Sequence, residues 1–209
     1  MKYYDISRSI SPQMAVYKNY ENKRPSSKTE ADFDTRGFFE NSFCSNLHTG
    51  THIDAPAHMI KGGDSIDKID LNHFYGKAKV FDLTDVQGAI YRKDIEKLDI
   101  KKGDIVLFKT RNSFVEEFDP EFVYIEEDAA QYLVDLGIKT VGIDAMSIER
   151  GKAHHPTHDI ILGAKIAVIE DIRLREVAEG LYILTALPLK LEGLEASFTR
   201  AVLWELTTD

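Results

Sequence analysis

Histidine and aspartate side chains crowd into one short stretch of the sequence, residues 48 to 58. These eleven positions hold His48, His52, Asp54 and His58. Neutral imidazole and carboxylate are ligands that suit Zn²⁺, and Mn²⁺ or Fe²⁺ less selectively. Single histidines are common in proteins, but three of them around an aspartate within so few positions are not. The stretch therefore predicts a metal site rather than a set of solvated or hydrogen-bonded histidines.

Gly50 and Pro56 determine how these side chains are presented. Both residues oppose a continuous helix, and Pro56 favours extended backbone before it. In an extended chain residues i and i+2 point to the same side, so His52 and Asp54 share a face. Gly50 can take the positive φ that brings His48 beside them. Three ligands then converge on one ion and leave a position open for water, as in a catalytic metal site.

Two residues beside this stretch keep alternative interpretations. His58 follows Pro56 by two positions, and it is either a further ligand or the base that moves protons for an activated water. Cys44, the only cysteine, precedes His48 by four positions, which permits a catalytic thiol or a further ligand. We favour the interpretation that Cys44 packs as a small apolar residue on the strand that leads to the site, because free cysteine usually behaves as a hydrophobe.

A second histidine cluster follows much later, and six of the seven histidines fall in the two windows 48 to 58 and 154 to 158. Pro156 suits the first turn of a helix and Gly163 its end, so we expect a short helix that carries His158 inward. His154 and His155 precede this helix in a loop and are the weaker ligand candidates.

Glu170 directly follows the apolar run 166–169. A carboxylate at the end of a buried strand is costly unless it is paired or binds a metal, so Glu170 joins the candidates, with a solvated strand end as the alternative. The candidate ligands are then His48, His52, Asp54, His158 and Glu170. Because they outnumber the ligands of one tetrahedral ion, two ions bridged by carboxylates become an alternative to one. Asp144 also follows an apolar run and is either a site residue or a cap.

Apolar runs predict the elements that position these groups. The predicted strands are 3–10, 77–83, 105–110, 140–143, 166–169, 181–187 and 201–206, with further strands within 33–47. The predicted helices are 92–98, 126–136 and 156–163. Residues 14–27 lack a period and predict a long surface loop, either a lid over the site or simply a mobile segment. We therefore expect a strand-rich α/β protein with few helices.

Composition limits the classes of function. A chain of 209 residues, 43% hydrophobic and 29% charged, fits one globular domain covering residues 1–209. A net charge of −9 argues against a nucleic acid or an anionic membrane as partner, and by itself favours a neutral or cationic substrate. We expect no membrane span, because no apolar run reaches about 18 residues. The N-terminal residues lack the apolar core of a secretory signal, and a single cysteine is typical of a reducing compartment, so we expect the cytoplasm.

The motif H-x-G-T-H-x-D-x-P-x-H is met in full by His48, Gly50, Thr51, His52, Asp54, Pro56 and His58. On these residues the chain resembles the metal-dependent hydrolase family named for putative cyclases, which includes bacterial kynurenine formamidases and isatin hydrolases. The likeness continues through residues 141–144, 158–170, 187–193 and 200–203, and so covers nearly the whole chain.

The resemblance implies a swivelling β/β/α fold, a homodimer or homotetramer, and a centre of one or two divalent ions, with Zn²⁺ first and Mn²⁺ second. His48, His52 and Asp54 would hold the first ion, and His158 the second. Asp54 and Glu170 would bridge the two. A metal-bound hydroxide would then attack the carbonyl of a small amide or formamide, and His58 would pass a proton to the leaving nitrogen.

The N-terminal loop departs from the family pattern. The formamidases carry an aromatic residue followed by Pro-Gly-Asp beside the substrate, whereas here Tyr17 is followed by Lys18, Asn19 and Tyr20. Tyr17 is thus the expected substrate-binding residue, and the substrate is open among aryl amides, cyclic amides and lactones. Two other functions stay open: a metal-dependent lyase or cyclase, and a non-catalytic metal-binding protein. The second is disfavoured because structural zinc sites prefer cysteine ligands.

Overall fold

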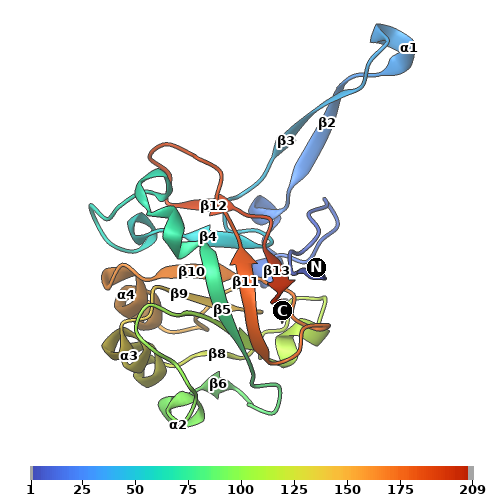
Figure 1. The fold of residues 1–209 in the computed structure, drawn as a ribbon. Coiled ribbons are helices and arrows are strands. Elements are labelled where there is room, and N and C mark those ends of the chain that lie inside the picture. Colours follow the sequence, from blue (N-terminus) through green and yellow to red (C-terminus); the bar gives the residue numbers. More distant parts are fainter. Residues whose placement is uncertain (1, 207–209) are drawn as a thin grey trace.

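A nine-stranded mixed sheet forms the body of the protein in this computed structural model, which describes residues 2–206 (Figure 1). In spatial order its strands are β1 (Tyr3–Asp5), β13 (Val202–Glu205), β11 (Gly180–Thr185), β5 (Tyr75–Asp82), β7 (Ile105–Lys109), β9 (Thr140–Ile143), β10 (Ala167–Glu170), β4 (His52–Asp54) and β12 (Ala196–Phe198). The central strands β5, β7, β9 and β10 are parallel, and the flanking pairs are antiparallel. β6 (Ala89–Ile90) and β8 (Tyr124–Ile125) form a separate short pair.

Helices are few in the described residues, and most of them lie on one side of the sheet (Figure 1). They are α1 (Phe33–Arg36), α2 (Arg92–Ile95), α3 (Glu127–Leu136) and α4 (Pro156–Gly163), with single 3₁₀ turns η1 (Tyr17–Asn19), η2 (Glu21–Lys23), η3 (Pro56–His58), η4 (Ile66–Lys68), η5 (Leu71–His73) and η6 (Arg111–Phe114). α3 ends where Gly137 takes φ 72° and its N–H donates to the carbonyls of Leu133 and Val134, a left-handed cap that favours glycine.

The central strands are buried on both faces, which explains their continuous apolar sequences. Along β7, Val106 and Phe108 point into the core beneath the helices, while Ile105 and Leu107 point into a second core on the opposite face. This alternation follows from the two-residue repeat of a strand. The parallel strands therefore form a rigid platform, and β10 and β4 at its edge carry the candidate ligands Glu170, His52 and Asp54.

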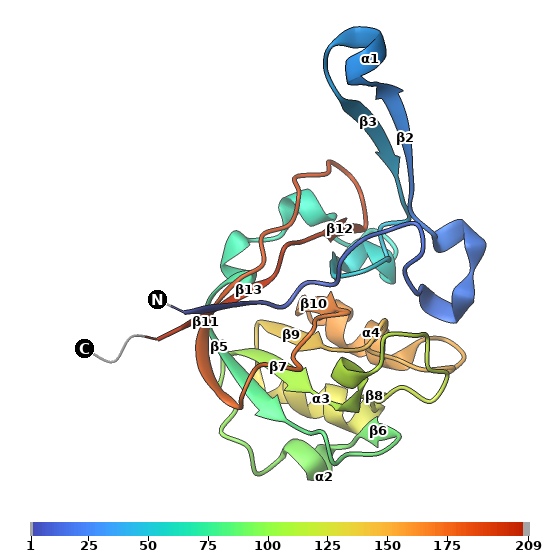
Figure 2. The same ribbon diagram turned by 90° about the vertical axis from the view of Figure 1, so that its right-hand side faces the viewer.

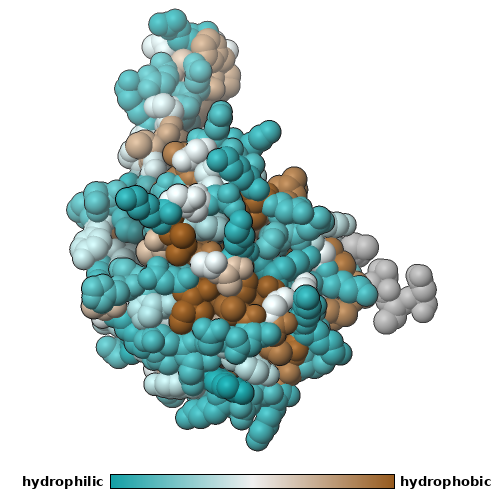
Figure 3. Space-filling view, turned by 90° about the vertical axis from the view of Figure 1, so that its left-hand side faces the viewer, coloured by the Kyte–Doolittle hydropathy of each residue, from teal (hydrophilic) through white to brown (hydrophobic). Residues whose placement is uncertain are grey.

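Residues 26–44 form an arm that projects from the body (Figures 1 and 2). The arm consists of β2 (Ser26–Ala31) paired antiparallel with β3 (Glu40–Cys44), and α1 at its tip. Asp32 caps α1 by accepting a hydrogen bond of 2.8 Å from the Thr35 N–H. Apolar side chains gather toward the tip (Figure 3), and both strands are largely exposed.

Most predicted elements are confirmed. The strands expected at 77–83, 105–110, 140–143, 166–169, 181–187 and 201–206 are β5, β7, β9, β10, β11 and β13, with ends that differ by at most two residues. The helices at 126–136 and 156–163 are α3 and α4, whereas the helix expected at 92–98 ends at Ile95. The first strand also ends early, at Asp5, because Ser7 pairs with Ile172 instead of continuing along β13.

The long surface loop expected at residues 14–27 contains the 3₁₀ turns η1 and η2 and ends in the start of β2, and the buried Met14 and Val16 anchor it to the body. One prediction near the site is wrong. Cys44 is exposed rather than packed. The reason is that β3 belongs to the projecting arm, where neither face of the strand meets a core. No helix in the described part of the chain is long and apolar enough to cross a membrane.

Candidate metal centre

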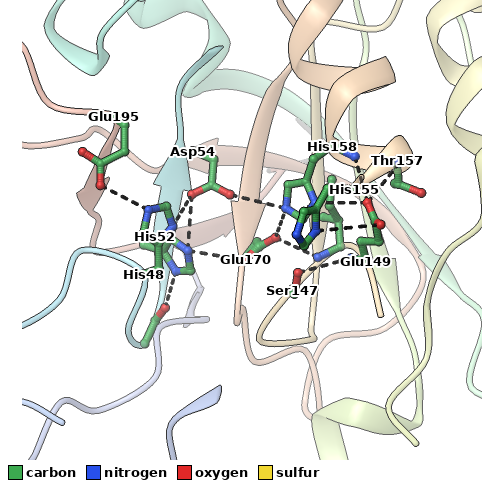
Figure 4. Close-up of polar contacts among 12 residues, drawn as sticks. His48, His52, Asp54, Ser147, Glu149, His155, Thr157, His158, Glu170 and Glu195 are labelled. Atoms are coloured by element: carbon green, nitrogen blue, oxygen red, sulfur yellow. Dashed lines mark hydrogen bonds and ion pairs between the residues drawn. The ribbon is translucent and has the colours of Figure 1, made fainter. Parts of the chain in front are cut away.

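Two neighbouring strands bring the candidate ligands together. Antiparallel pairing places His52 of β4 opposite Glu170 of β10, and Asp54 follows His52 on the same face. Gly50 takes φ 69°, and its carbonyl accepts a 2.7 Å hydrogen bond from Nδ1 of His52. This bond leaves Nε2 of His52 free to face the carboxylates. The positive φ expected at Gly50 is thus confirmed, and His48 lies beside Asp54 as expected (Figure 4).

Three of these residues, His52, Asp54 and Glu170, hold polar atoms that are spaced as ligands of one ion would be, and His48 contacts the same Asp54 carboxylate. His48 Nδ1 lies 2.9 Å from Asp54 Oδ1, and His52 Nε2 lies 3.4 Å from both Asp54 Oδ1 and Glu170 Oε2. Ligands at about 2.1 Å from a tetrahedral ion stand roughly 3.4 Å from one another. The group therefore fits a divalent cation without rearrangement of the backbone.

His158 faces the other side of the same two carboxylates (Figure 4). Its Nε2 lies 3.9 Å from Asp54 Oδ2 and 3.4 Å from Glu170 Oε1. Each carboxylate thus presents one oxygen toward His52 and the other toward His158. This is the arrangement that two bridging carboxylates between two ions require. We call His48, His52, Asp54, His158 and Glu170 together the candidate metal centre.

Several of these atoms are buried without a partner. Within residues 2–206, His52 Nε2 and both oxygens of Asp54 have no hydrogen-bond partner, although each residue is 1% exposed. Buried polar atoms are rarely left unsatisfied, because losing water costs about 1–3 kcal/mol for each group. A cation would satisfy all three atoms at once.

The carboxylates of the centre are held in the anionic form that binds a metal. Burial opposes ionisation of Asp54, yet the positive charge of His52 and the close approach of the His48 ring outweigh it and hold the Asp54 pKa well below its usual value. Burial and the charge of Asp54 oppose ionisation of Glu170 too, but contacts with His158 and His52 lower its pKa to about 2.

Two acidic residues that the sequence analysis missed orient the histidines. Glu149, 2% exposed, accepts hydrogen bonds from the N–H groups of Thr157 and His158 at 3.0 and 3.2 Å, and its Oε2 lies 3.3 Å from His158 Nδ1. Glu195 Oε1 lies 3.3 Å from Nε2 of His48. Each carboxylate engages the ring nitrogen that faces away from the centre, which is how ligating histidines are usually fixed. Both residues lie in connections without a periodic signal, so only the fold reveals them.

His58 lies at the edge of the centre and lines a cavity. Its ring centroid is 4.1 Å from that of His48 and 5.7 Å from that of His158. Burial lowers the pKa of His58 to about 4, with the nearby histidines contributing, so the ring is neutral and can accept a proton. The cavity, of about 230 Å³, is also lined by Tyr17 and Lys23. His58 and Tyr17, both candidates from the sequence, therefore line the same cavity.

Other residues from the sequence analysis fall outside the centre. Asp144 is buried and accepts hydrogen bonds of 2.7 to 3.0 Å from the backbone N–H and hydroxyl groups of Thr110 and Ser113, so it acts as a structural cap. His154 is exposed and joins no cluster of metal-binding groups in the described residues. His155 lines the cavity, with Nδ1 3.9 Å from Glu149 Oε1.

Comparison with known proteins places this site in a family. Residues 4–150 match the family described as putative cyclase. The chain belongs to this family. Among cyclase-family proteins it is similar to the kynurenine formamidase of Salinibacter ruber (strain DSM 13855 / M31), with 34% identity over 202 residues that cover 95% of each chain.

Solved structures agree with this placement. A "predicted metal-dependent hydrolase from Bacillus stearothermophilus" shares 46% identity and a TM-score of 0.89, with 97% of each chain covered. Isatin hydrolase A from Ralstonia solanacearum has the same fold, with a TM-score of 0.85 at 22% identity over 98% of this chain and 92% of the other. The α/β fold that the resemblance implied for this cyclase-family chain is thus confirmed.

Proposed function

We propose that this protein is a metal-dependent hydrolase that cleaves the C–N bond of a small amide. The observation that carries the proposal is the pair of buried carboxylates, Asp54 and Glu170, each shared between His52 and His158. Family membership supports it, as do the relatives described as a kynurenine formamidase and a metal-dependent hydrolase.

The donor set supports a specific division of ligands. His48, His52 and Asp54 would hold one ion, and His158 would hold a second together with Asp54 and Glu170. Nitrogen and carboxylate donors in tetrahedral spacing favour Zn²⁺, with Mn²⁺ as the alternative. Glu149 positions His158 for this role, because its contact with Nδ1 leaves Nε2 directed at the carboxylates.

His58 is the proton donor and acceptor in this proposal. A bound divalent ion would supply an activated water and polarise the amide carbonyl. Hydrolysis then forms a C–O bond from the water, breaks the C–N bond and yields a carboxylic acid and an amine. His58, neutral and facing the cavity, accepts a proton from the water and returns it to the leaving nitrogen.

Tyr17 lines the same cavity as His58 and would contact the substrate there. Its ring is fixed by edge contacts with Phe118 and Phe122, at centroid distances of 5.5 and 6.4 Å. A rigid aromatic wall suits an aryl substrate, and a cavity of about 230 Å³ suits a small one. The substrate is therefore a small aryl amide, with a cyclic amide or a lactone as alternatives.

A metal-dependent lyase or cyclase is the second candidate, because the description of the family names cyclases. The two reactions differ in their products, since hydrolysis consumes one water and a cyclisation or isomerisation does not. Mass spectrometry of products formed in H₂¹⁸O separates them: incorporation of one labelled oxygen supports hydrolysis, and unlabelled product refutes it.

The first test is metal content per chain on protein purified without added metal, measured beside turnover of N-formylkynurenine and simple aryl formamides. Two ions per chain together with turnover is the expected result. Loss of the fold on chelation, with no turnover across amides and esters, would instead indicate a structural metal and refute the enzyme.

The arm supports assembly with a second copy of this chain. Phe33, Phe39, Phe43 and Phe38 are 71%, 58%, 55% and 48% exposed. At about 200 Å² for each buried phenyl side chain, one arm offers roughly 450 Å² of apolar surface. Two arms in a two-fold dimer supply more than half of a typical interface of about 1,600 Å². We propose a homodimer, or a homotetramer built from it, in which each arm lies on its partner.

Two further features remain proposals. Both apolar cores share one sheet, which supports a single domain of residues 1–209. The lone cysteine supports a reducing compartment, so we propose the cytoplasm as the location of the protein.

A further inference from the structure

Lys23 brings a positive charge to the cavity beside the candidate metal centre. It ends η2, is half-buried, and lines the same cavity as His58 and Tyr17. Its backbone is held in place, because its carbonyl accepts a 2.8 Å hydrogen bond from the hydroxyl of Thr49. Since Thr49 directly follows His48, the lysine is tied to the segment that carries the first candidate ligands.

The Lys23 ammonium has no anionic partner within residues 2–206. It makes neither a side-chain hydrogen bond nor an ion pair there, and its near neighbour is the Tyr17 ring, whose centroid lies 5.6 Å from Nζ. A partly desolvated cation without a counter-ion is unfavourable. An anionic ligand bound in the cavity would compensate this charge.

Divalent ions bound at the candidate metal centre would change the charge around Lys23. Asp54 and Glu170 are the carboxylates whose charge reaches Lys23. Once these two carboxylates bind divalent ions, their negative charge is compensated and the cavity becomes positive. Lys23 would then face like charge, unless the bound molecule is itself an anion. The positive charge in the cavity thus favours an anionic substrate, whereas the net charge of −9 by itself favours a neutral or cationic one.

We propose that Lys23 binds a carboxylate of the substrate, so that the enzyme selects aryl amides bearing an anionic group over neutral ones. The inference rests on the proposed function and deepens it by naming the substrate class. The contact lies away from the reacting carbonyl and acts on ground state and transition state alike, so its loss raises KM and leaves kcat nearly unchanged.

Lys18 provides a matched control. Its Nζ lies 5.2 Å from the centroid of the same Tyr17 ring, but the side chain is exposed and does not line the cavity. Removing the charge at position 18 therefore tests the general effect of losing a lysine next to Tyr17, without removing the charge from the cavity.

The experiment compares two formamides that differ in one carboxylate, 2-formamidobenzoate and formanilide, on the metal-loaded wild type, Lys23→Met, Lys23→Arg and Lys18→Met. We expect the wild type to prefer 2-formamidobenzoate. Lys23→Met should raise KM for this substrate by about ten- to a hundredfold, the range for a hydrogen bond to a charged group, and leave formanilide unchanged. Lys23→Arg should recover much of the loss, and Lys18→Met should resemble the wild type.

Calorimetric binding of the products, 2-aminobenzoate and aniline, separates this inference from the proposed function. Weaker binding of 2-aminobenzoate alone in Lys23→Met supports the contact with Lys23 rather than with the metal, which that variant retains. Equal losses for both substrates or both products would overturn the inference, as would a wild type that does not distinguish them. Binding that depends on Lys23 without turnover of either formamide would refute the proposed formamide hydrolysis and leave the anion contact standing.

Discussion

Around the candidate metal centre the buried atoms are polar, and along the arm the exposed side chains are apolar. Asp54 is 1% exposed with two oxygens that lack partners in the described residues, whereas Phe33 is 71% exposed at the tip of the arm. Both arrangements are unfavourable for an isolated chain, for opposite reasons. A cation would satisfy the buried polar atoms of the centre, and a covering surface would bury the phenyl rings of the arm, so each region indicates what the chain binds.

The two regions also differ in rigidity. The centre rests on β4 and β10, which are buried within the sheet, while β2 and β3 pair only with each other. An isolated two-stranded ribbon is marginally stable in water. Substitutions at the centre should therefore change chemistry and leave assembly intact, and substitutions in the arm should do the reverse. Four experiments test this separation.

Asp54→Asn should have the largest effect. The substitution replaces the carboxylate proposed to bind both ions with a neutral amide. We therefore expect metal content to fall and turnover to drop to background, with the oligomer unchanged. Elemental analysis, an amide hydrolysis assay and light scattering measure the three properties. Asp64→Asn, which alters an exposed carboxylate paired with Lys165, is the control. Full metal content in Asp54→Asn would remove Asp54 from the ligand set.

His58→Ala should separate chemistry from metal binding. Losing the proton donor and acceptor is expected to lower kcat by about 10²- to 10⁴-fold while metal content stays at the wild-type value. His154→Ala, at an exposed histidine outside the cluster, should leave both unchanged. If His58→Ala instead loses metal in proportion to activity, His58 is a ligand and its alternative interpretation is correct.

Glu149→Gln should weaken metal binding more moderately. The neutral amide can still accept the backbone N–H groups of α4, but it holds the His158 ring less firmly, so we expect metal affinity to fall by about ten- to a hundredfold. Competition with a chromophoric chelator measures the affinity, and circular dichroism checks the fold. Glu121→Gln, at an exposed glutamate, is the control. Unchanged affinity would show that Glu149 serves only to anchor the helix.

Phe33→Ser combined with Phe39→Ser should have the smallest effect on catalysis, but it should weaken association of the oligomer. These two rings stack at the tip of the arm with centroids 6.5 Å apart. Their removal should raise the dissociation constant of the oligomer by at least about tenfold, with metal content unchanged. Sedimentation over a range of concentrations measures this, with Thr29→Ser in the same arm as the control. An unaltered oligomer would exclude the arm as the interface.

Local sequence could predict the strands that have continuous apolar runs and the helices that have recognisable first and last residues. The apolar run of β7 and the acidic start and terminal glycine of α3 were sufficient for both assignments. In the arm, β3 lies within the predicted range 33–47, whereas β2 was missed because its sequence is polar and α1 separates it from β3. A short strand such as β12 is defined only by its pairing with β4, which no local pattern encodes.

The sequence by itself determined the chemistry, because the ligand types, the glycine at position 50 and the proline at position 56 are properties of consecutive residues. Tertiary structure decided which candidate ligands lie close enough together to share an ion. The antiparallel register of β4 and β10 sets Glu170 opposite His52, and α4 delivers His158 to the other side of both carboxylates. Glu149, Glu195 and Lys23 could be recognised only there, since their roles depend on distances between segments far apart in the chain.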